Sequence, residues 1–325
     1  MMKRRELITL LSGAAAWPLA ARAQQAAVPV IGYLELGASE GRVYMVTAFR
    51  KGLSELGYIE GRNVAIEYRW GNYEIDRLYD LAADLVARRV NVIAVAGGGP
   101  SALAAKAATS SIPIVFGTAG DPIQIGLVAS LNRPGGNVTG ITNMSVEVSA
   151  KRLGLLHELL PRAKRFALLR YPNTSSAEIA ELREAASTIG AQVEVFGAAS
   201  SDEIDRAFAN LVQNRSDALL LVPHPLFSNR RVQLVTLASR HGIPAVFYDR
   251  EYVNAGGLMS YGASAADQAR QVGIYVGRVL NGERPADLPV IQAAKFEFVI
   301  NLQTAKILGI VVPPSLLARA DEVID

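Results

Sequence analysis

The sequence predicts an α/β protein made of two units, each a parallel, doubly wound sheet with helices on both faces. Short apolar runs alternate with longer amphipathic segments from Val28 onwards, and Gly, Pro and Asn separate them. With 325 residues and 50% hydrophobic content, the chain has the length for two domains of about 150 residues and the apolar content for two cores. Since neither half carries a nucleotide-binding fingerprint, we expect two lobes with a ligand cleft between them.

The first 23 residues have the features of an export signal. The basic segment Lys3-Arg4-Arg5 precedes a short apolar stretch, and Ala21-Arg22-Ala23 is a small-x-small cleavage site. The apolar stretch is too short and too rich in alanine for a stable transmembrane helix. We therefore expect cleavage after Ala23 and a periplasmic location. Arg4-Arg5 also fits a twin-arginine signal, and the general secretory route stays open.

The net charge of the chain is confined to this leader. Residues 1–23 hold four basic residues against Glu6 alone, which equals the +3 of the whole chain and leaves residues 24–325 neutral. A neutral body lacks the basic surface that a phosphate backbone requires, so we expect no nucleic-acid binding. The sequence has no cysteine and three scattered histidines, so we expect no disulfide, no thiol nucleophile, no metal site and no other cofactor.

The first half alternates strand-like and helix-like segments. Val46, Phe49 and Leu53 show the three- and four-residue spacing of an amphipathic helix, and Asp121-Pro122 is an N-cap followed by a first-turn proline. The expected strands are Val28–Leu34, Val64–Trp70, Asn91–Ala96, Ile112–Phe116 and Val138–Ile141, and the expected helices are Ser39–Leu56, Ile75–Arg89, Ser101–Ala108 and Asp121–Leu131.

One turn of this half has the features of an anion site. Gly97-Gly98-Gly99-Pro100-Ser101 lies between an apolar strand and an alanine-rich helix. Pro100 suits the first helical position, and the Ser101 hydroxyl is placed to bond a nearby backbone N–H. Backbone N–H groups at the positive end of a helix dipole bind carboxylates. A purely structural turn is the alternative, because every open α/β sheet has such turns.

The second half shows the same pattern without a repeat of sequence. Its expected strands are Phe166–Leu169, Val193–Phe196, Ala218–Val222, Ala245–Phe247, Gly256–Gly262 and Phe296–Ile300. Its expected helices are Ser149–Leu160, one that ends at Ile189, Asp202–Val212, one that ends at His241, Asp267–Leu280, and Leu302–Leu308 with Asn301 as its cap.

Several motifs together indicate a family. They are Asp121-Pro122 through Gly126-Leu127-Val128, Leu131 to Gly140, Gly256 to Gly262, Leu288-Pro289-Val290, Phe296 to Asn301 and Ala318 to Glu322. In these the chain resembles the type I periplasmic substrate-binding proteins of ABC transporters, within an uncharacterised subfamily that includes tryptophan- and tyrosine-type binding proteins. The resemblance covers essentially all of residues 1–325. It implies a binding protein, not an enzyme, whose two Rossmann-like lobes close on a small ligand and deliver it to a membrane permease and its ATPase.

The resemblance also implies lobes that are discontinuous in sequence, joined by three crossings. We place the crossings near Thr142, Val253 and Val290. The first lobe would then comprise residues 28–142 and 254–289, and the second residues 143–253 and 290–325. We expect a monomer that binds a small polar or amino-acid-like ligand.

A closing cleft needs polar groups at strand ends of both lobes and an apolar or aromatic wall. In the first lobe the turn at Gly98, Gly99 and Ser101 would take a carboxylate, with Thr118 nearby, and Asp121 would take an ammonium. Helix capping is the alternative for Asp121. Glu35, after the first strand, is a further candidate, with a solvated loop position as its alternative.

In the second lobe the candidates lie after strands. They are Tyr171, Asn173, His224 and Phe227, with Asn143 at the hinge and Tyr261 at the end of a strand near the cleft. Tyr171 would stack on a flat ligand or shield the sheet end. For His224 the alternative is an ordinary loop histidine, and for Tyr261 it is packing. Relatives more often carry Asn-Pro at residues 171–172 and Asp-Pro at residues 224–225.

Other classes of function fit less well. The glycine-rich turn lacks the lysine of a phosphate-binding loop, and no serine lies in a GxSxG elbow, so we expect no catalytic residues. A sugar-responsive repressor of this fold would need a DNA-binding helix pair where the export signal stands. A ligand-sensing module that signals to a membrane receptor shares the fold and the site, and it is the alternative function.

Overall fold

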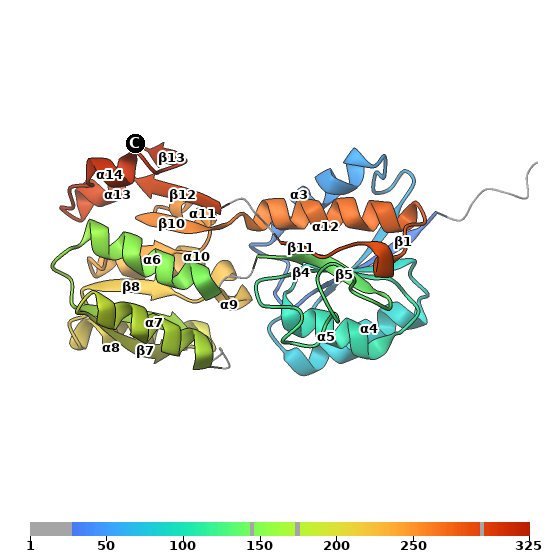
Figure 1. Ribbon diagram of the computed structural model, residues 1–325, viewed down its shortest axis with the longest axis horizontal. Coiled ribbons are helices and arrows are strands. Elements are labelled where there is room, and N and C mark those ends of the chain that lie inside the picture. The colour runs from blue at the N-terminus through green and yellow to red at the C-terminus, as the bar shows by residue number, and fades with distance from the viewer. Residues whose placement is uncertain (1–27, 144–145, 173–175, 293–295) are drawn as a thin grey trace, which may run out of the picture.

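The computed structural model describes residues 28–143, 146–172, 176–292 and 296–325. These residues form two α/β lobes side by side, each built around one sheet with helices on both faces (Figure 1). The predicted fold class is confirmed. The predicted export signal lies outside the described residues, and within them no helix combines the length and apolarity that a membrane crossing requires.

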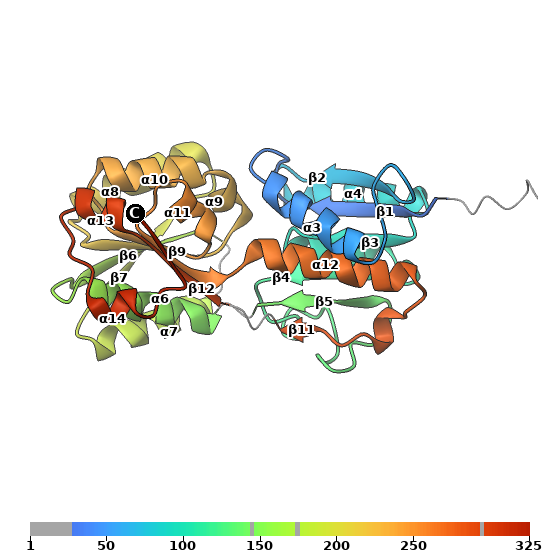
Figure 2. The same cartoon turned by 90° about the horizontal axis from the view of Figure 1, so that it is seen from above.

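The sheet of the first lobe has the strand order β11-β5-β4-β3-β1-β2, and all neighbouring strands are parallel. Its strands are β1 (Val30–Glu35), β2 (Ala65–Trp70), β3 (Val92–Val95), β4 (Ile114–Thr118), β5 (Val138–Thr142) and β11 (Ile291–Gln292). One face is covered by α3 (Val43–Glu55) and α12 (Ala265–Leu280), and the other by α4 (Ile75–Ala87) and α5 (Gly99–Ala108) (Figure 2). Alternate side chains of β1 enter the two cores, with Tyr33 on the α3 face and Leu34 on the α4 face.

The sheet of the second lobe has the order β13-β12-β10-β9-β8-β6-β7. Its strands are β6 (Arg165–Arg170), β7 (Gln192–Gly197), β8 (Ala218–Leu221), β9 (Ala245–Phe247), β10 (Met259–Ala263), β12 (Phe296–Asn301) and β13 (Glu322–Ile324). One face packs against α6 (Val146–Leu159), α7 (Ser176–Thr188), α13 (Leu302–Ile307) and α14 (Pro314–Leu317), and the other against α8 (Ser201–Gln213), α9 (Pro225–Asn229) and α10 (Arg231–Arg240). The short helices α11 (Arg250–Asn254) and η1 (Pro285–Asp287) complete the described elements.

Both sheets repeat one topology. The order β2-β1-β3-β4-β5 in the first lobe corresponds to β7-β6-β8-β9-β10 in the second, again with parallel neighbours. In such a sheet the strand order reverses once, between β1 and β3 in the first lobe and between β6 and β8 in the second. Ligands of open α/β sheets bind at the carboxyl ends of the strands beside this reversal. The topology therefore marks one position in each lobe.

The second crossing between the lobes differs from the prediction. The first crossing follows β5, which ends at Thr142 as expected. However, β10 pairs with β9 and so extends the second sheet, which puts the second crossing at Ser264 and not near Val253. The third follows β11, which pairs with β5. The predicted ranges 254–289 and 290–325 are corrected accordingly, since the sequence does not state which sheet a strand joins.

A second correction concerns strand direction. β12 runs antiparallel to β10 within an otherwise parallel sheet. The chain leaves the second lobe after β10, builds α12 and β11 in the first lobe, and re-enters as β12 from the opposite side. This return path imposes the antiparallel pairing.

The helix predicted from Asp121 to Leu131 does not form, and the segment consists of turns. Asp121 still acts as a cap, because its Oδ1 accepts the N–H groups of Ile123 and Gln124 at 2.8 and 3.3 Å. Gly126 then adopts a φ of 74°, which departs from helical geometry. The Lys106 ammonium of α5 donates to the Gly126 carbonyl at 2.6 Å, so a side chain satisfies this acceptor in place of a helix turn.

The helix that follows the second crossing packs against α3 through glycines. Gly52 of α3 faces the Arg270 carbonyl, and Gly273 of α12 faces the Phe49 carbonyl. A Cβ at either glycine would overlap the facing backbone oxygen. The two backbones are therefore in direct contact, which anchors α12 in the first lobe directly after the crossing.

We expect Gly273→Ala to lower the free energy of unfolding by about 1–3 kcal/mol, because the added methyl forces the two helices apart. Urea denaturation measures this loss. The matched control is Gly154→Ala in α6, an exposed helical position with open space beside it, where alanine leaves stability unchanged or raises it by up to about 1 kcal/mol. Equal stability of Gly273→Ala and the wild type would show that the helices do not touch through this glycine.

Candidate functional site

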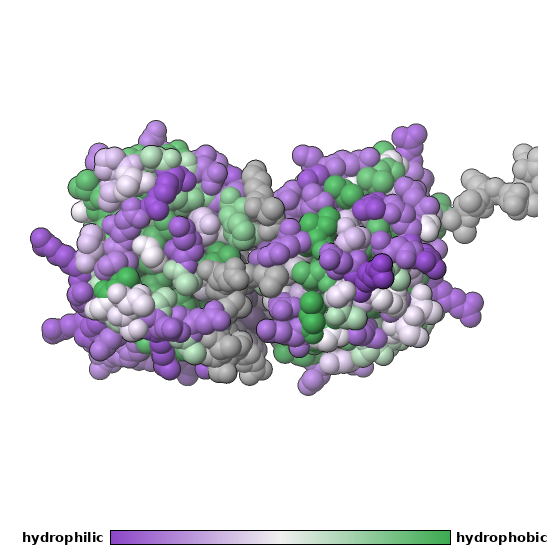
Figure 3. Space-filling model, in the orientation of Figure 1, coloured by the Kyte–Doolittle hydropathy of each residue, from purple (hydrophilic) through white to green (hydrophobic). Residues whose placement is uncertain are grey.

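The residues at the two reversal points are the starting point for the site. In the first lobe they are Glu35, which ends β1, and the turn Gly97–Ser101, which follows β3. In the second lobe they are Tyr171, which follows β6, and His224, which follows β8. We call the boundary between the lobes the seam, and Figure 3 shows one lobe on either side of it. Four of these positions were singled out from sequence, so topology brings predicted residues together.

The turn after β3 has the predicted position and a different bonding pattern. Gly98 is the N-cap of α5 with a φ of 78°, a conformation that favours glycine. Pro100 is the second helical residue, not the first. The Ser101 side chain is fully buried, yet its Oγ has no hydrogen-bond partner in the protein, so it does not cap the helix as expected. The turn also packs on β1, since a Cβ on Gly97 would lie 3.0 Å from the carbonyl carbon of Glu35.

Thr118 and Asn143 lie together at the ends of β4 and β5. The Thr118 Oγ1 accepts the Gly120 N–H at 3.3 Å and would lie 3.9 Å from a Cβ on Gly99. The Thr118 carbonyl accepts the Asn143 N–H at 3.1 Å and the Gln268 side-chain amide at 3.0 Å. The Asn143 Oδ1 is buried without a partner in the protein. Thr118 is thus bound to its own loop, whereas Asn143 keeps an acceptor for another group.

Tyr171 and His224 stack on each other. Their ring centroids are 3.9 Å apart with an interplanar angle of 11°. His224 is also the N-cap of α9, because its Nδ1 accepts the Leu226 N–H at 3.2 Å. The reversal point of the second lobe therefore presents a pair of flat rings held by a helix cap.

His224 is neutral at ordinary pH. Burial lowers its pKa from the usual 6.5 to about 4, and the positive charge of Arg42 adds to this effect. Arg42 belongs to the first lobe, so its influence on His224 acts across the seam.

The remaining predicted residues have other surroundings. Phe227 is fully buried in the core of the second lobe. Tyr261 stacks on Phe296 at 5.9 Å and 13° and packs against the other core of that lobe. Asp121 caps its own turn, as described above. These contacts favour the structural alternatives for Asp121 and Tyr261 and assign Phe227 to the core. Asn173 lies outside the described residues.

The structure adds Arg42, which the sequence reading missed, and raises the importance of Glu35. Both side chains are buried, with 0% of Glu35 and 6% of Arg42 exposed. The Glu35 Oε1 accepts the Gly37 N–H at 3.2 Å and lies 3.5 Å from the Arg42 Nη2. In sequence the two charges flank a short polar loop, which resembles a solvated surface turn. Only their burial distinguishes them.

The lobes contact each other through what we call the closure contacts. Asn229 donates to the Ala38 carbonyl at 3.5 Å, and Arg231 donates to the Gly41 carbonyl at 3.2 Å. The Arg231 guanidinium also lies 5.9 Å from the centre of the Tyr44 ring. The loop before α3 is thereby joined to α9 and α10 of the second lobe.

Buried polar atoms without a partner in the protein gather along the seam. They include the Glu35 Oε2, the Arg42 Nε, the Ser101 Oγ, the Asn143 Oδ1 and the Asn229 Oδ1. Native proteins leave few buried polar atoms unpaired, and each such atom calls for an explanation. Their concentration at the carboxyl ends of the strands indicates a polar ligand site.

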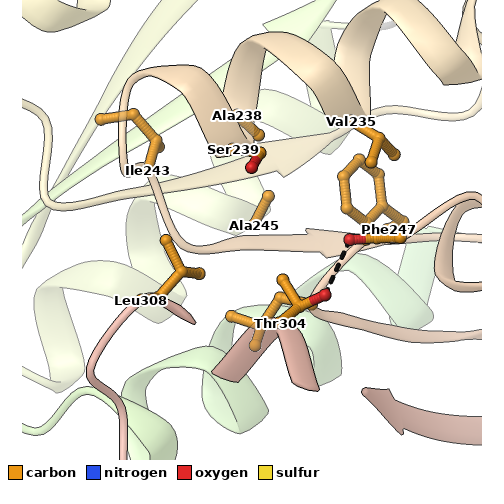
Figure 4. A pocket seen from close by; sticks show the side chains of 11 residues that line it. Val235, Ala238, Ser239, Ile243, Ala245, Phe247, Thr304 and Leu308 are labelled. Carbon is orange, nitrogen blue, oxygen red and sulfur yellow. Dashed lines mark hydrogen bonds between the residues drawn. The ribbon is translucent and has the colours of Figure 1, made fainter. Parts of the chain in front are cut away.

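The apolar cavity in Figure 4 is a different feature. It lies inside the second lobe between α10, β9 and α13, and its volume is about 10 Å³. Its lining includes Val235, Phe247 and Leu308, and the Thr304 hydroxyl donates to the Gly256 carbonyl at 2.9 Å. This is room for one water at most.

In the described part of the chain, no cluster of His, Asp and Glu is arranged to hold a metal ion.

The comparison with protein families decides the assignment. Residues 28–324 match the family described as ABC transporter substrate binding protein. The chain belongs to this family. It is also 29% identical over 263 residues to a tyrosine-binding protein of Clostridioides difficile. This match covers 80% of this chain and 75% of that protein.

Two solved structures with the same sequence identity to this chain differ in how closely they superpose on it. The domain from Streptococcus pneumoniae in complex with L-Trp has a TM-score of 0.81 at 26% identity. The ligand-free, open substrate binding protein with adhesive properties from Clostridium difficile has a TM-score of 0.65, also at 26% identity. Each alignment covers 91% of this chain and 99% of the other.

We expect His224→Asn to reduce the acid sensitivity of the fold. The pKa of His224 is about 4 when folded and about 6.5 when unfolded, so the unfolded chain takes up the proton first. The free energy of unfolding of the wild type should therefore fall as the pH drops from 6.5 towards 4, with this residue contributing about 2 kcal/mol between pH 7 and pH 5. Asparagine keeps an N-cap acceptor and does not titrate.

Urea denaturation at pH 7 and pH 5 measures the difference. His241→Asn, at an exposed histidine that ends α10, is the control and should follow the wild type. If the wild type and His224→Asn lose the same free energy of unfolding between pH 7 and pH 5, His224 is not held in its neutral form by burial.

We expect Arg231→Ala to open the lobes. The charge-assisted bond to the Gly41 carbonyl contributes about 1 kcal/mol, which corresponds to a change of about five-fold in the ratio of closed to open molecules. Small-angle X-ray scattering should show a larger radius of gyration than for the wild type. Arg240→Ala, at an exposed position on the same helix, should leave the curve unchanged. Identical curves for wild type and Arg231→Ala would exclude a role in closure.

Proposed function

We propose that this protein is the exported solute-binding component of an ABC importer. It binds a small polar or amino-acid-like ligand between its lobes and delivers it to a permease and its ATPase. The proposal rests on the buried polar atoms at the seam that have no partner in the protein. They include side-chain oxygens of Glu35, Ser101 and Asn229. A ligand with several hydrogen-bonding groups would supply the partners.

The position of these groups supports a cleft site. Each lobe contributes the carboxyl ends of strands beside its order reversal, which is where open α/β sheets bind ligands. One side offers backbone N–H groups and the Ser101 hydroxyl at the start of α5, and the other offers the stacked rings of Tyr171 and His224. Such a set suits a molecule with an anionic end and a flat or apolar body.

The relatives support the amino-acid class and the closed state. One is a tyrosine-binding protein, and another was solved in complex with L-Trp. At equal identity, the lobes fit the L-Trp complex with a TM-score of 0.81 and the open, ligand-free protein with 0.65. The closure contacts of Arg231 and Asn229 fit an arrangement in which a bound ligand is enclosed.

The location and the mode of action follow from the same proposal. Residues 1–23 would direct export and be removed after Ala23, so that the mature protein acts as a monomer in the periplasm. It would bind and release its ligand without chemical change.

A thermal-shift screen of the mature protein tests the proposal. The panel contains the twenty amino acids, aromatic acids, sugars and small anions. A ligand present at 100 times its Kd stabilises the folded state by about 2.7 kcal/mol, which raises Tm by several degrees. Ser101→Ala should weaken this shift, whereas Ser54→Ala, at an exposed serine of α3, should not. Product formation in a turnover assay, with no ligand that shifts Tm, would contradict a binding function.

A further inference from the structure

We propose that Glu35 is the acceptor for a primary ammonium group of the ligand, so that the ligand class is a small molecule bearing such a group. The inference rests on the proposed function in that it takes the seam as the ligand site. It goes further by naming the group recognised and the side chain that recognises it.

The bonding of the Glu35 carboxylate is half complete. Its Oε1 accepts the Gly37 N–H at 3.2 Å and faces the Arg42 guanidinium at 3.5 Å. Its Oε2 is buried and has no partner in the protein. A buried carboxylate oxygen without a hydrogen bond is costly, and a cationic donor is the partner that compensates it best. Glu35 thus offers one acceptor that the protein leaves unused.

Arg42 holds the Glu35 carboxylate in place through an ion pair. A Cβ placed on Gly37 would lie 3.4 Å from the Arg42 Nε, 3.5 Å from the Glu35 Oε1 and 3.6 Å from the Tyr73 hydroxyl, so these groups surround one point. Tyr73 packs against the core of the second lobe, which sets this point at the seam. The paired charge of Arg42 lowers the cost of burying the carboxylate, and the ion pair engages the Oε1 while the Oε2 stays without a partner in the protein.

Other acidic or basic groups near the seam are committed elsewhere. Asp121 bonds the backbone of its own turn, and Asp249 caps α11 by accepting the Glu251 N–H at 2.9 Å. His224 is neutral, and its Nδ1 already accepts a backbone N–H. Of the Glu35, Asp121 and Asp249 carboxylates, Glu35 is the one with a buried oxygen that has no partner in the protein.

The neighbourhood of Glu35 suits a ligand whose ammonium and carboxylate lie close together. A Cβ on Gly97 would contact both the Ser101 hydroxyl and the carbonyl carbon of Glu35. The turn that would take a carboxylate therefore packs on the backbone of the residue whose side chain would take an ammonium. In an α-amino acid these two groups share one carbon atom.

Isothermal titration of three probes with wild type and Glu35→Gln tests the proposal. L-tryptophan carries both groups, indole-3-propionate lacks the ammonium, and tryptamine lacks the carboxylate. We expect the wild type to prefer L-tryptophan over indole-3-propionate by at least 30-fold, and Glu35→Gln to lose most of that preference while binding indole-3-propionate unchanged. Glutamine keeps an acceptor for the Gly37 N–H, so a purely structural role would weaken both ligands equally.

Two further variants complete the test. Glu35→Asp keeps the charge beside Arg42 and should retain part of the preference even if Glu35→Gln does not fold. Glu67→Gln removes an ion pair with Arg69 in the same lobe, where the Glu67 side chain is 38% exposed, and should bind like the wild type. If Glu35→Gln and Glu35→Asp keep the preference for L-tryptophan over indole-3-propionate, the proposed role of Glu35 is overturned, and the amino-acid proposal still stands. A wild type that binds neither the twenty amino acids nor tryptamine overturns the amino-acid proposal as well.

Discussion

Burial of the Glu35–Arg42 pair where two lobes meet is the constraint on which the site depends. Charges in a low-dielectric interior are stable only with partners of good geometry, and this pair is held by one 3.5 Å contact and one backbone N–H. The lobes that bury the pair also bring Arg42 close enough to lower the pKa of His224. The contact between the lobes, the buried charges of Glu35 and Arg42, and the protonation of His224 therefore depend on one another. A polar ligand would enter it as the missing partner.

The rest of the fold serves to hold this seam. Two sheets that share one core strand order each have their reversal point at the seam, and three crossings connect the lobes. The glycines of α3 and α12 anchor the chain in the first lobe directly after the second crossing, because their backbones touch. Bonds such as that from Arg231 to the Gly41 carbonyl join the two lobes across the seam.

Most of the individual elements follow from local patterns, and the errors have physical causes. The strands at Val92 and Ala218 are short apolar runs between turns, a pattern typical of buried strands in a parallel sheet. The Asp121 side chain does cap the start of a turn, as predicted. The predicted helix does not continue, because Gly126 leaves helical geometry and its carbonyl accepts a hydrogen bond from Lys106 instead of from a helical N–H. The second crossing was misplaced because pairing partners are not encoded in a strand's own residues. β10 joins the second sheet through β9, which lies elsewhere in the chain.

By itself the sequence determined the α/β class, the family, the turn at Gly97–Ser101 and the strand-end positions of Tyr171 and His224, because apolar periodicity and glycine turns act over a few residues. Only the tertiary structure decided what those positions do. It stacked Tyr171 on His224, left the Ser101 hydroxyl unpartnered, and buried Glu35 with Arg42. These outcomes depend on which side chains from distant segments meet and on how much water is excluded between them. Burial converts a loop carboxylate that looks solvated in the sequence into an acceptor with one oxygen that has no partner in the protein.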